Sequence, residues 1–319
     1  MMKEIIVTEG IAEEEMMLFP SLKTLRLEGL PKLTRFCHRN CSLFPSLTKL
    51  ALVKCPLLET FISSPTIGDT SHVTTSKKRE NAYKSPLFDA KVAFPCLEEL
   101  TIIGLENLRI IWHHQPPAAS FPKLKSLAIG HCGELLTVGS SDILGKLCKS
   151  LEVLKVIACR SVEMIFDLGE VYIEKSHGAQ DTMWNKDSRD ILSFQNLQSV
   201  RAVGHPNLQN MFPAPVAMGF QQLEEFGSVN RGIETERVVA FEGEEAARRF
   251  VFSCLSTLYL WDLPRLKCFY PGKHVTEWPV LKKFRGYHFE GIKEKNVESL
   301  DAFPVQLPLF TLEEVCVCL

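Results

Sequence analysis

Three residues near the N-terminus, Cys37, His38 and Cys41, have the types and the spacing of metal ligands. Thiolate and imidazole groups bind zinc, but a structural zinc site needs a fourth ligand at a suitable distance along the chain, and none is apparent. Cys316 and Cys318 are two residues apart and do not form the C-x-x-C pattern of a redox pair. We therefore predict no metal site.

Other patterns that could carry chemistry are incomplete. In the stretch GSSDILGKLC, Gly139 and Gly145 are six residues apart, where a phosphate-binding loop needs five, and Leu147 replaces the required Ser or Thr. We interpret Ile143, Leu144 and Leu147 as the buried side of a short helix. No Gly-x-Ser-x-Gly or His-Glu-x-x-His motif occurs. The sequence therefore predicts no catalytic site, no bound cofactor and no enzyme.

The composition limits the classes of protein further. The chain has 319 residues, 45% hydrophobic and 23% charged, which argues against long disorder. Its net charge of −2 gives no reason to expect a nucleic acid partner. No apolar run approaches the roughly 18 residues of a membrane span, and no signal peptide is apparent. The 11 cysteines are thus expected as reduced thiols in a cytoplasmic protein.

The elements that would position any functional residue come from an internal repeat. A phrase of the form LxxLxL, with variations, recurs mostly every 25 to 27 residues. Its copies begin at Leu22, Leu47, Leu97, Leu124, Leu151, Leu197, Leu223, Leu255, Leu281 and Leu312. An aromatic residue stands three positions before the first leucine in eight of the ten copies, at Phe19, Phe44, Phe94, Phe121, Phe194, Phe220, Phe252 and Trp278. This common phase predicts repeated structural units.

The spacing within the phrase predicts a strand. Its last two leucines are two residues apart and therefore point to one face. A single strand cannot bury that face, but stacked copies form a parallel sheet over a continuous leucine core. The position three residues after the last strand leucine holds Leu30, Cys55, Leu105, Cys132, Cys159, His205 or Leu263. We interpret its cysteines as small buried hydrophobic residues with a weak S–H donor.

The phrases FPSLKTLRLEGLPKLTRF, FPCLEELTIIGLENLRIIW and FSCLSTLYLWDLPRLKCFY resemble a known family. They are similar to the C-terminal leucine-rich repeats of plant nucleotide-binding leucine-rich-repeat disease-resistance proteins, with the coiled-coil class as the nearest match. The resemblance covers Phe19 to Leu319. It implies an α/β leucine-rich-repeat solenoid with a parallel sheet on the concave face, and loops and short helices on the convex face.

The same resemblance implies a function in intracellular pathogen recognition. Such a region would sense a pathogen effector or a guarded host protein and would restrain a nucleotide-dependent switch. ADP or ATP is expected only in a nucleotide-binding domain outside this chain, and that domain is a further expected partner. The alternative is a substrate-recruiting subunit of a ubiquitin ligase, for which residues 1–18 are too short to hold the expected F-box-like segment. An extracellular receptor would be expected to carry a signal peptide and paired-cysteine caps.

We expect a single domain over residues 1–319, with about ten units, starting in the middle of a repeat. Insertions are predicted near residues 62–93, 167–193 and 231–251, with a short helix near Glu244 to Phe250 in the third. The interval of 50 residues between Leu47 and Leu97 could hold a degraded repeat.

Strand alternation predicts which side chains line the concave face, because residues between the buried leucines point outward. The candidate protein-binding residues are Arg26, Lys49, Glu99, Lys155, Arg201, Tyr259, Trp261, Lys283, Arg285 and Tyr287. The last five combine aromatic and basic side chains, which binding hot spots favour. We therefore predict a protein-binding patch there. The competing interpretation is that Trp261 only packs against a neighbouring strand residue.

Overall fold

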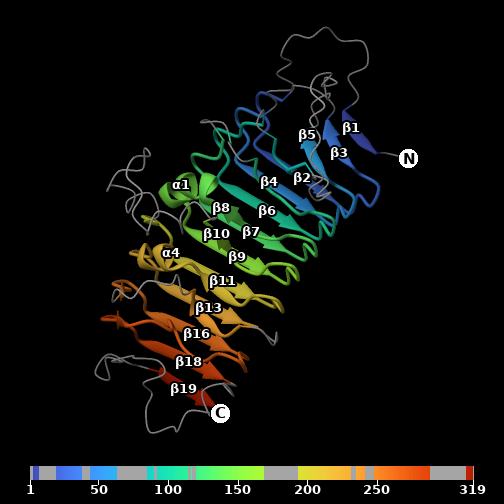
Figure 1. Cartoon of the computed structure of the whole chain (residues 1–319). Helices are drawn as coiled ribbons and strands as arrows, with labels where there is room; N and C mark the ends of the chain where they lie inside the picture. Colours follow the sequence, from blue (N-terminus) through green and yellow to red (C-terminus); the bar gives the residue numbers. More distant parts are fainter. Residues whose placement is uncertain are drawn as a thin grey trace, which may run out of the picture.

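A parallel sheet of ten strands runs along one side of the protein in the computed structural model (Figure 1). The structure describes residues 3–6, 19–37, 44–62, 85–89, 92–113, 116, 120–168, 193–230, 235–240, 248–287 and 314–318. The ten strands are β2 (Thr24–Glu28), β4 (Lys49–Val53), β6 (Glu99–Ile103), β7 (Ser126–Gly130), β9 (Val153–Ile157), β11 (Ser199–Val203), β13 (Glu225–Val229), β16 (Thr257–Trp261), β18 (Lys283–Tyr287) and β19 (Glu314–Cys318). Each begins two residues after the first leucine of a predicted phrase, so the solenoid prediction is confirmed.

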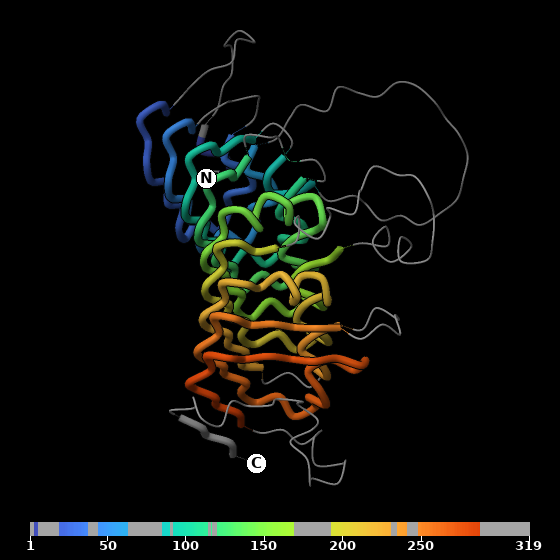
Figure 2. The backbone as a smooth tube through the Cα atoms, turned by 90° about the vertical axis from the view of Figure 1, so that its left-hand side faces the viewer, coloured from blue at the N-terminus to red at the C-terminus, as the bar shows by residue number. Residues whose placement is uncertain are grey.

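Shorter elements build the rest of each turn. The short strands are β1 (Glu4–Ile6), β3 (Arg35–Cys37), β5 (Thr60–Ile62), β8 (Gly139–Ser140), β10 (Phe166–Asp167), β12 (Asn210–Phe212), β14 (Arg237–Val239), β15 (Arg248–Val251) and β17 (His274–Glu277). Two helices are described, α1 (Ser141–Ser150) and α4 (Ala214–Met218). The short strands pair in parallel within four small sheets, β1-β3-β5, β10-β8, β12-β14 and β15-β17. Figure 2 shows the resulting turns stacked along one axis.

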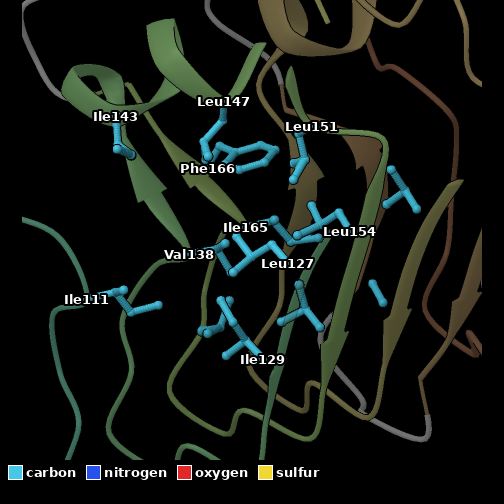
Figure 3. Close-up of a cluster of buried hydrophobic side chains, with 14 of the residues drawn as sticks. Ile111, Leu127, Ile129, Val138, Ile143, Leu147, Leu151, Leu154, Ile165 and Phe166 are labelled. Carbon is cyan, nitrogen blue, oxygen red and sulfur yellow. The ribbon is translucent and has the colours of Figure 1, made fainter. Parts of the chain in front are cut away.

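The core lies between the large sheet and this second layer. From β2 to β18, the second and fourth residues of the strands point inward, as Leu127 and Ile129 of β7 do, and both are at most 1% exposed. They pack near Val138 and Ile165 from the opposite layer (Figure 3). Each fully buried side chain of this kind stabilises the fold by about 1.5–3 kcal/mol. Helix α1 covers the core with Ile143, Leu144 and Leu147, the side that the sequence predicted to be buried.

The aromatic residues form columns along the stack. The rings of Phe44 and Phe94, which belong to neighbouring turns, have centroids 5.9 Å apart, and Phe94 lies 5.5 Å from Phe121. Near the C-terminus, Phe252 stacks on Trp278 at 4.5 Å. All five rings are at most 4% exposed. At these five positions the repeated aromatic residue is therefore part of the core, where rings of adjacent turns pack against one another.

Two sequence expectations need correction. Strand β4 pairs directly with β6, so the interval between Leu47 and Leu97 contributes no strand to the large sheet. It contributes one extra rung to the opposite layer: Phe61 N–H donates to Leu87 O, and Phe88 N–H donates to Ile111 O. The helix expected near Glu244 to Phe250 is also wrong at its end, because Arg248–Val251 is strand β15, paired with β17. Most of the three predicted insertions lies outside the described residues.

Most strands of the large sheet end in a left-handed residue. The residue that follows the strand has a positive φ at Gly29, Lys54, Gly104, His131, Ala158, Gly204 and Asp262. Its N–H donates to the last carbonyl of the next strand, as Ala158 N–H does to Val203 O at 2.6 Å. This turn therefore continues the ladder at these seven positions, whether or not the residue is a glycine.

Replacing Ala158 with glycine should stabilise the protein. A residue with a side chain costs about 1–2 kcal/mol in the left-handed region, and glycine avoids this cost. Glycine also makes the unfolded chain more flexible, which lowers the stability of the folded protein by about 0.4–1 kcal/mol. The net gain should be about 0.5 kcal/mol, measured as a higher urea midpoint. The matched control is Gly204→Ala one turn later, at φ 74°, which should change stability in the opposite direction. Equal midpoints for the two variants would contradict the role of the turn.

Candidate functional site

The candidate binding surface is the outer side of the ten-stranded sheet, here called the concave face. The strands pair without any shift, so that equivalent residues of successive strands lie side by side. The first, third and fifth residues of the strands therefore form three outward rows. All ten predicted residues lie in these rows, with Tyr259 half-buried and the others exposed. Their placement was predicted correctly from the strand period alone.

Several of the charged candidates are already paired with one another or with neighbours. Arg26 contacts Glu28 at 2.7 Å, and Lys49 contacts Glu99 at 2.7 Å across two strands. Arg201 contacts Glu225 at 2.6 Å, a partner that sequence analysis did not identify. The hydrogen bond from Arg26 lowers the pKa of Glu28. Exposed pairs of this kind contribute roughly 0–1 kcal/mol each, so they adjust the charge pattern of the face more than its stability.

The five residues Tyr259, Trp261, Lys283, Arg285 and Tyr287 form one group, here called the aromatic–basic cluster. Trp261 and Tyr287 are register partners on β16 and β18, and their rings stack with centroids 4.9 Å apart and an interplanar angle of 30°. The guanidinium of Arg285 lies 5.7 Å from the centroid of the Tyr259 ring. Trp261 remains 43% exposed and Tyr287 40% exposed. Trp261 thus packs against its neighbour and still presents an aromatic surface to solvent.

The other candidates lie away from this cluster. Lys155 is in the third row, between Ala128 and Arg201 of the neighbouring strands. Arg26, Lys49 and Glu99 occupy the N-terminal strands. The structure therefore separates the ten predicted residues into an N-terminal ion-pair region, a central basic pair and the C-terminal aromatic–basic cluster.

The cysteines of the repeated turn are buried thiols. Cys55, Cys132 and Cys159 are 0% exposed. The Cys132 thiol donates to Gly130 O at 3.3 Å, and Cys55 donates to Val53 O at 3.5 Å. Burial raises the pKa of Cys55, and a hydrogen bond with Cys159 together with burial raises that of Cys132. Burial also raises the pKa of Cys148 on α1 to about 12. Thiols whose pKa is raised, as in Cys55, Cys132 and Cys148, are weak nucleophiles, in agreement with a structural role.

Alkylation of the native protein should separate the two classes of cysteine. Iodoacetamide at about pH 8 reacts with thiolates, so the half-buried Cys96 and Cys254 should be modified first. Cys132 and Cys148 should react only after the protein is unfolded in urea. Mass spectrometry of tryptic peptides measures both rates, and native modification of Cys148 as fast as Cys254 would contradict this assignment.

His205 occupies the same turn position one unit after Cys159 and is 1% exposed. Its Nδ1 lies 3.2 Å from Cys159 O and its Nε2 lies 3.0 Å from Val156 O. A neutral imidazole can donate only one of these hydrogen bonds. Burial lowers the pKa of His205 from its ordinary value of 6.5, and the two carbonyl oxygens oppose that effect. The ring is therefore held neutral in the folded protein near pH 7.

This lowered pKa makes stability depend on pH in a defined direction. The unfolded chain binds a proton at His205 near pH 6.5, whereas the folded chain binds it only at lower pH. The stabilisation that comes from keeping His205 neutral is fully present above pH 6.5. It is lost as the pH falls toward the pKa of His205 in the folded protein. Leucine occupies the same turn position in two other units, at Leu105 and Leu263. The variant His205→Leu should therefore lose less stability than the wild type between about pH 7.5 and about pH 5.5. Urea denaturation at both pH values measures it, and an unchanged pH dependence would refute the assignment.

The remaining chemical candidates give no site in the described part of the chain. Cys37 is 0% exposed in the core, while His38 and Cys41 lie outside the described residues. Within the described residues, no group of three His, Cys, Asp or Glu side chains is placed to hold a metal ion. A cavity beside β8 and β10 is lined partly by Thr137 and Ser161, whose hydroxyls donate to Ile165 O and Gly133 O. No described helix is long and apolar enough to cross a membrane.

Comparison with known proteins agrees with the observed fold. Residues 96–183 and 179–232 match the family described as plant disease resistance protein RPS2-like, leucine-rich repeats. The matched part contains strands β6 to β13 of the concave face. No curated protein and no solved structure matches the chain significantly. The chain is therefore a leucine-rich-repeat solenoid whose central part is similar to the repeats of plant disease resistance proteins.

Proposed function

We propose that this chain is the protein-recognition region of a plant intracellular immune receptor. It binds a pathogen effector or a guarded host protein on its concave face. The chain also restrains a nucleotide-dependent switch, and ADP or ATP would bind to that switch, outside this chain. The observation that carries the proposal is the exposed aromatic–basic cluster on the same continuous sheet as the repeats similar to those of plant disease resistance proteins.

The composition of the cluster supports recognition of a protein. Trp, Tyr and Arg are the residues that most often dominate binding energy at protein interfaces. Trp261 and Tyr287 are held rigid by their mutual stacking, so that binding orders few additional side-chain rotations. Lys283 and Arg285 add positive charge next to the rings, which favours an acidic or mixed surface on the partner.

Alanine substitutions at Trp261 and Arg285 should each weaken partner binding without lowering thermal stability. Trp261 is 43% exposed, so truncation removes little core packing. A hot-spot residue contributes at least about 2 kcal/mol, or roughly a 30-fold change in Kd. The purified chain can capture proteins from pathogen-inoculated leaf extract, and the Kd of each recovered protein can then be measured with wild type and variants.

Leu136→Ala is the matched control, because Leu136 is 48% exposed but lies beside β8, away from the concave face. It should leave the Kd unchanged. Loss of fold in Trp261→Ala, or a Kd equal to that of wild type, would count against the proposal. Recovery of ubiquitin-ligase scaffold subunits instead of pathogen or defence proteins would favour the ubiquitin-ligase alternative.

A further inference from the structure

The fifth residues of the strands form an apolar row along the concave face. From β4 to β18 these residues are Val53, Ile103, Gly130, Ile157, Val203, Val229, Trp261 and Tyr287. They are register partners from strand to strand. Gly130, the only glycine of the row, does not interrupt it. The neighbouring isoleucines flank it closely, with Ile157 Cβ 3.6 Å and Ile103 Cγ1 3.7 Å from the position that a Cβ of Gly130 would occupy. The equivalent residue of β2 is Glu28, where the apolar row ends.

Much of this row is accessible to a partner. Ile157 is 38% exposed, Trp261 43% and Tyr287 40%, while Ile103, Val203 and Val229 are half-buried. The row includes the exposed aromatic rings of the aromatic–basic cluster and extends that surface toward the centre of the sheet. An exposed apolar row of this length is typical of an interaction site.

Basic side chains stand in the rows on either side of the apolar row, among small and uncharged residues. The third row contains Lys155, Arg201 and Arg285, and the residues that follow the strands include Lys54 and Asp262. Within the described residues, Asp262 is the only carboxylate in these two flanking rows. A partner that covers the apolar row would take Lys155 and Arg285 partly out of water, and carboxylates on that partner would compensate. The charge pattern therefore selects an acidic partner.

The spacing of the row distinguishes between forms of that partner. Adjacent strands lie about 4.8 Å apart, so the sheet offers one apolar residue every 4.8 Å or so. An α-helix laid along the row presents one side chain per turn on the same face, about every 5.4 Å. An extended segment presents one about every 6.7 Å. The helix follows the row more closely, and the seven strands from β6 to β18 would accommodate about 19 helical residues.

We propose that the apolar row binds an acidic amphipathic α-helix of the partner protein, lying across the strands with its apolar side on Ile157, Val203, Val229 and Trp261. This inference rests on the proposed function and specifies the chemistry of the partner. Lys155, Arg201 and Arg285 contact carboxylates on one flank of the helix. Tyr287 and Trp261 hold one end of the helix, because they are the largest exposed apolar side chains of the row.

A displayed peptide library tests this inference on the full chain. The library contains helical peptides of about 19 residues with leucine on one face and with Glu, Gln or Lys at the flanking positions. Selection should enrich Glu at the flanks. Ile157→Lys should weaken the selected peptides at least about tenfold, because a charge replaces an apolar contact. Leu136→Lys, at a position beside β8 that is 48% exposed, should change the Kd less than about twofold. Circular dichroism confirms the fold of both variants.

Three outcomes would overturn the helix inference: enrichment of Lys or Gln at the flanks, equal binding to Ile157→Lys, or failure to enrich any peptide. Unchanged affinity after a central proline is placed in a selected peptide would also overturn it, because proline breaks a helix. These results are distinguishable from failure of the proposed function. If leaf proteins still bind in a Trp261-dependent manner while no acidic helix is selected, the proposed function is supported and only the inference of a helical partner is rejected.

Discussion

The structure depends on burial that no repeat can complete alone. Each turn places leucines, and most turns also place an aromatic ring, on a surface that only the next turn can cover, so neighbouring units stabilise one another. The contact between Phe44 and Phe94 shows this well, because the two residues precede consecutive strands of the sheet, β4 and β6, and are separated by 50 positions along the chain. Long segments can therefore be inserted between turns, provided that the rings and leucines of neighbouring turns remain in contact.

Within each strand, the buried residues and the outward residues have separate roles, and this leaves the concave face available for binding. The second and fourth residues supply stability, and the first, third and fifth residues are free to vary. In β16 the buried pair is Leu258 and Leu260, while Tyr259 and Trp261 of the same strand point outward. Binding residues can consequently change from turn to turn without loss of the core, which suits a protein surface that must match a particular partner.

The strand period and the leucine phrase were sufficient to predict all ten strands and the outward placement of the ten candidate residues. The ion pair between Arg201 and Glu225 and the stacking of Trp261 on Tyr287 needed the register between strands, which a single sequence does not contain. The members of the apolar row are 26 to 50 positions apart in the chain and become neighbours only when stacked. The helix expected near Glu244 to Phe250 was wrong at its end, over residues 248–250, because pairing with β17 outweighed the local helix propensity there.

The additional rung at Leu87 and Phe88 affects the geometry of the whole surface. Between β4 and β6 the back layer holds one rung more than the sheet does, so the back is longer than the front at this point. The stack must bend there, and Figure 2 shows the N-terminal turns set at an angle to those that follow. A straight, rigid ligand would thus not follow the whole face, and only a curved or jointed molecule could contact Arg26, Ile157 and Trp261 together.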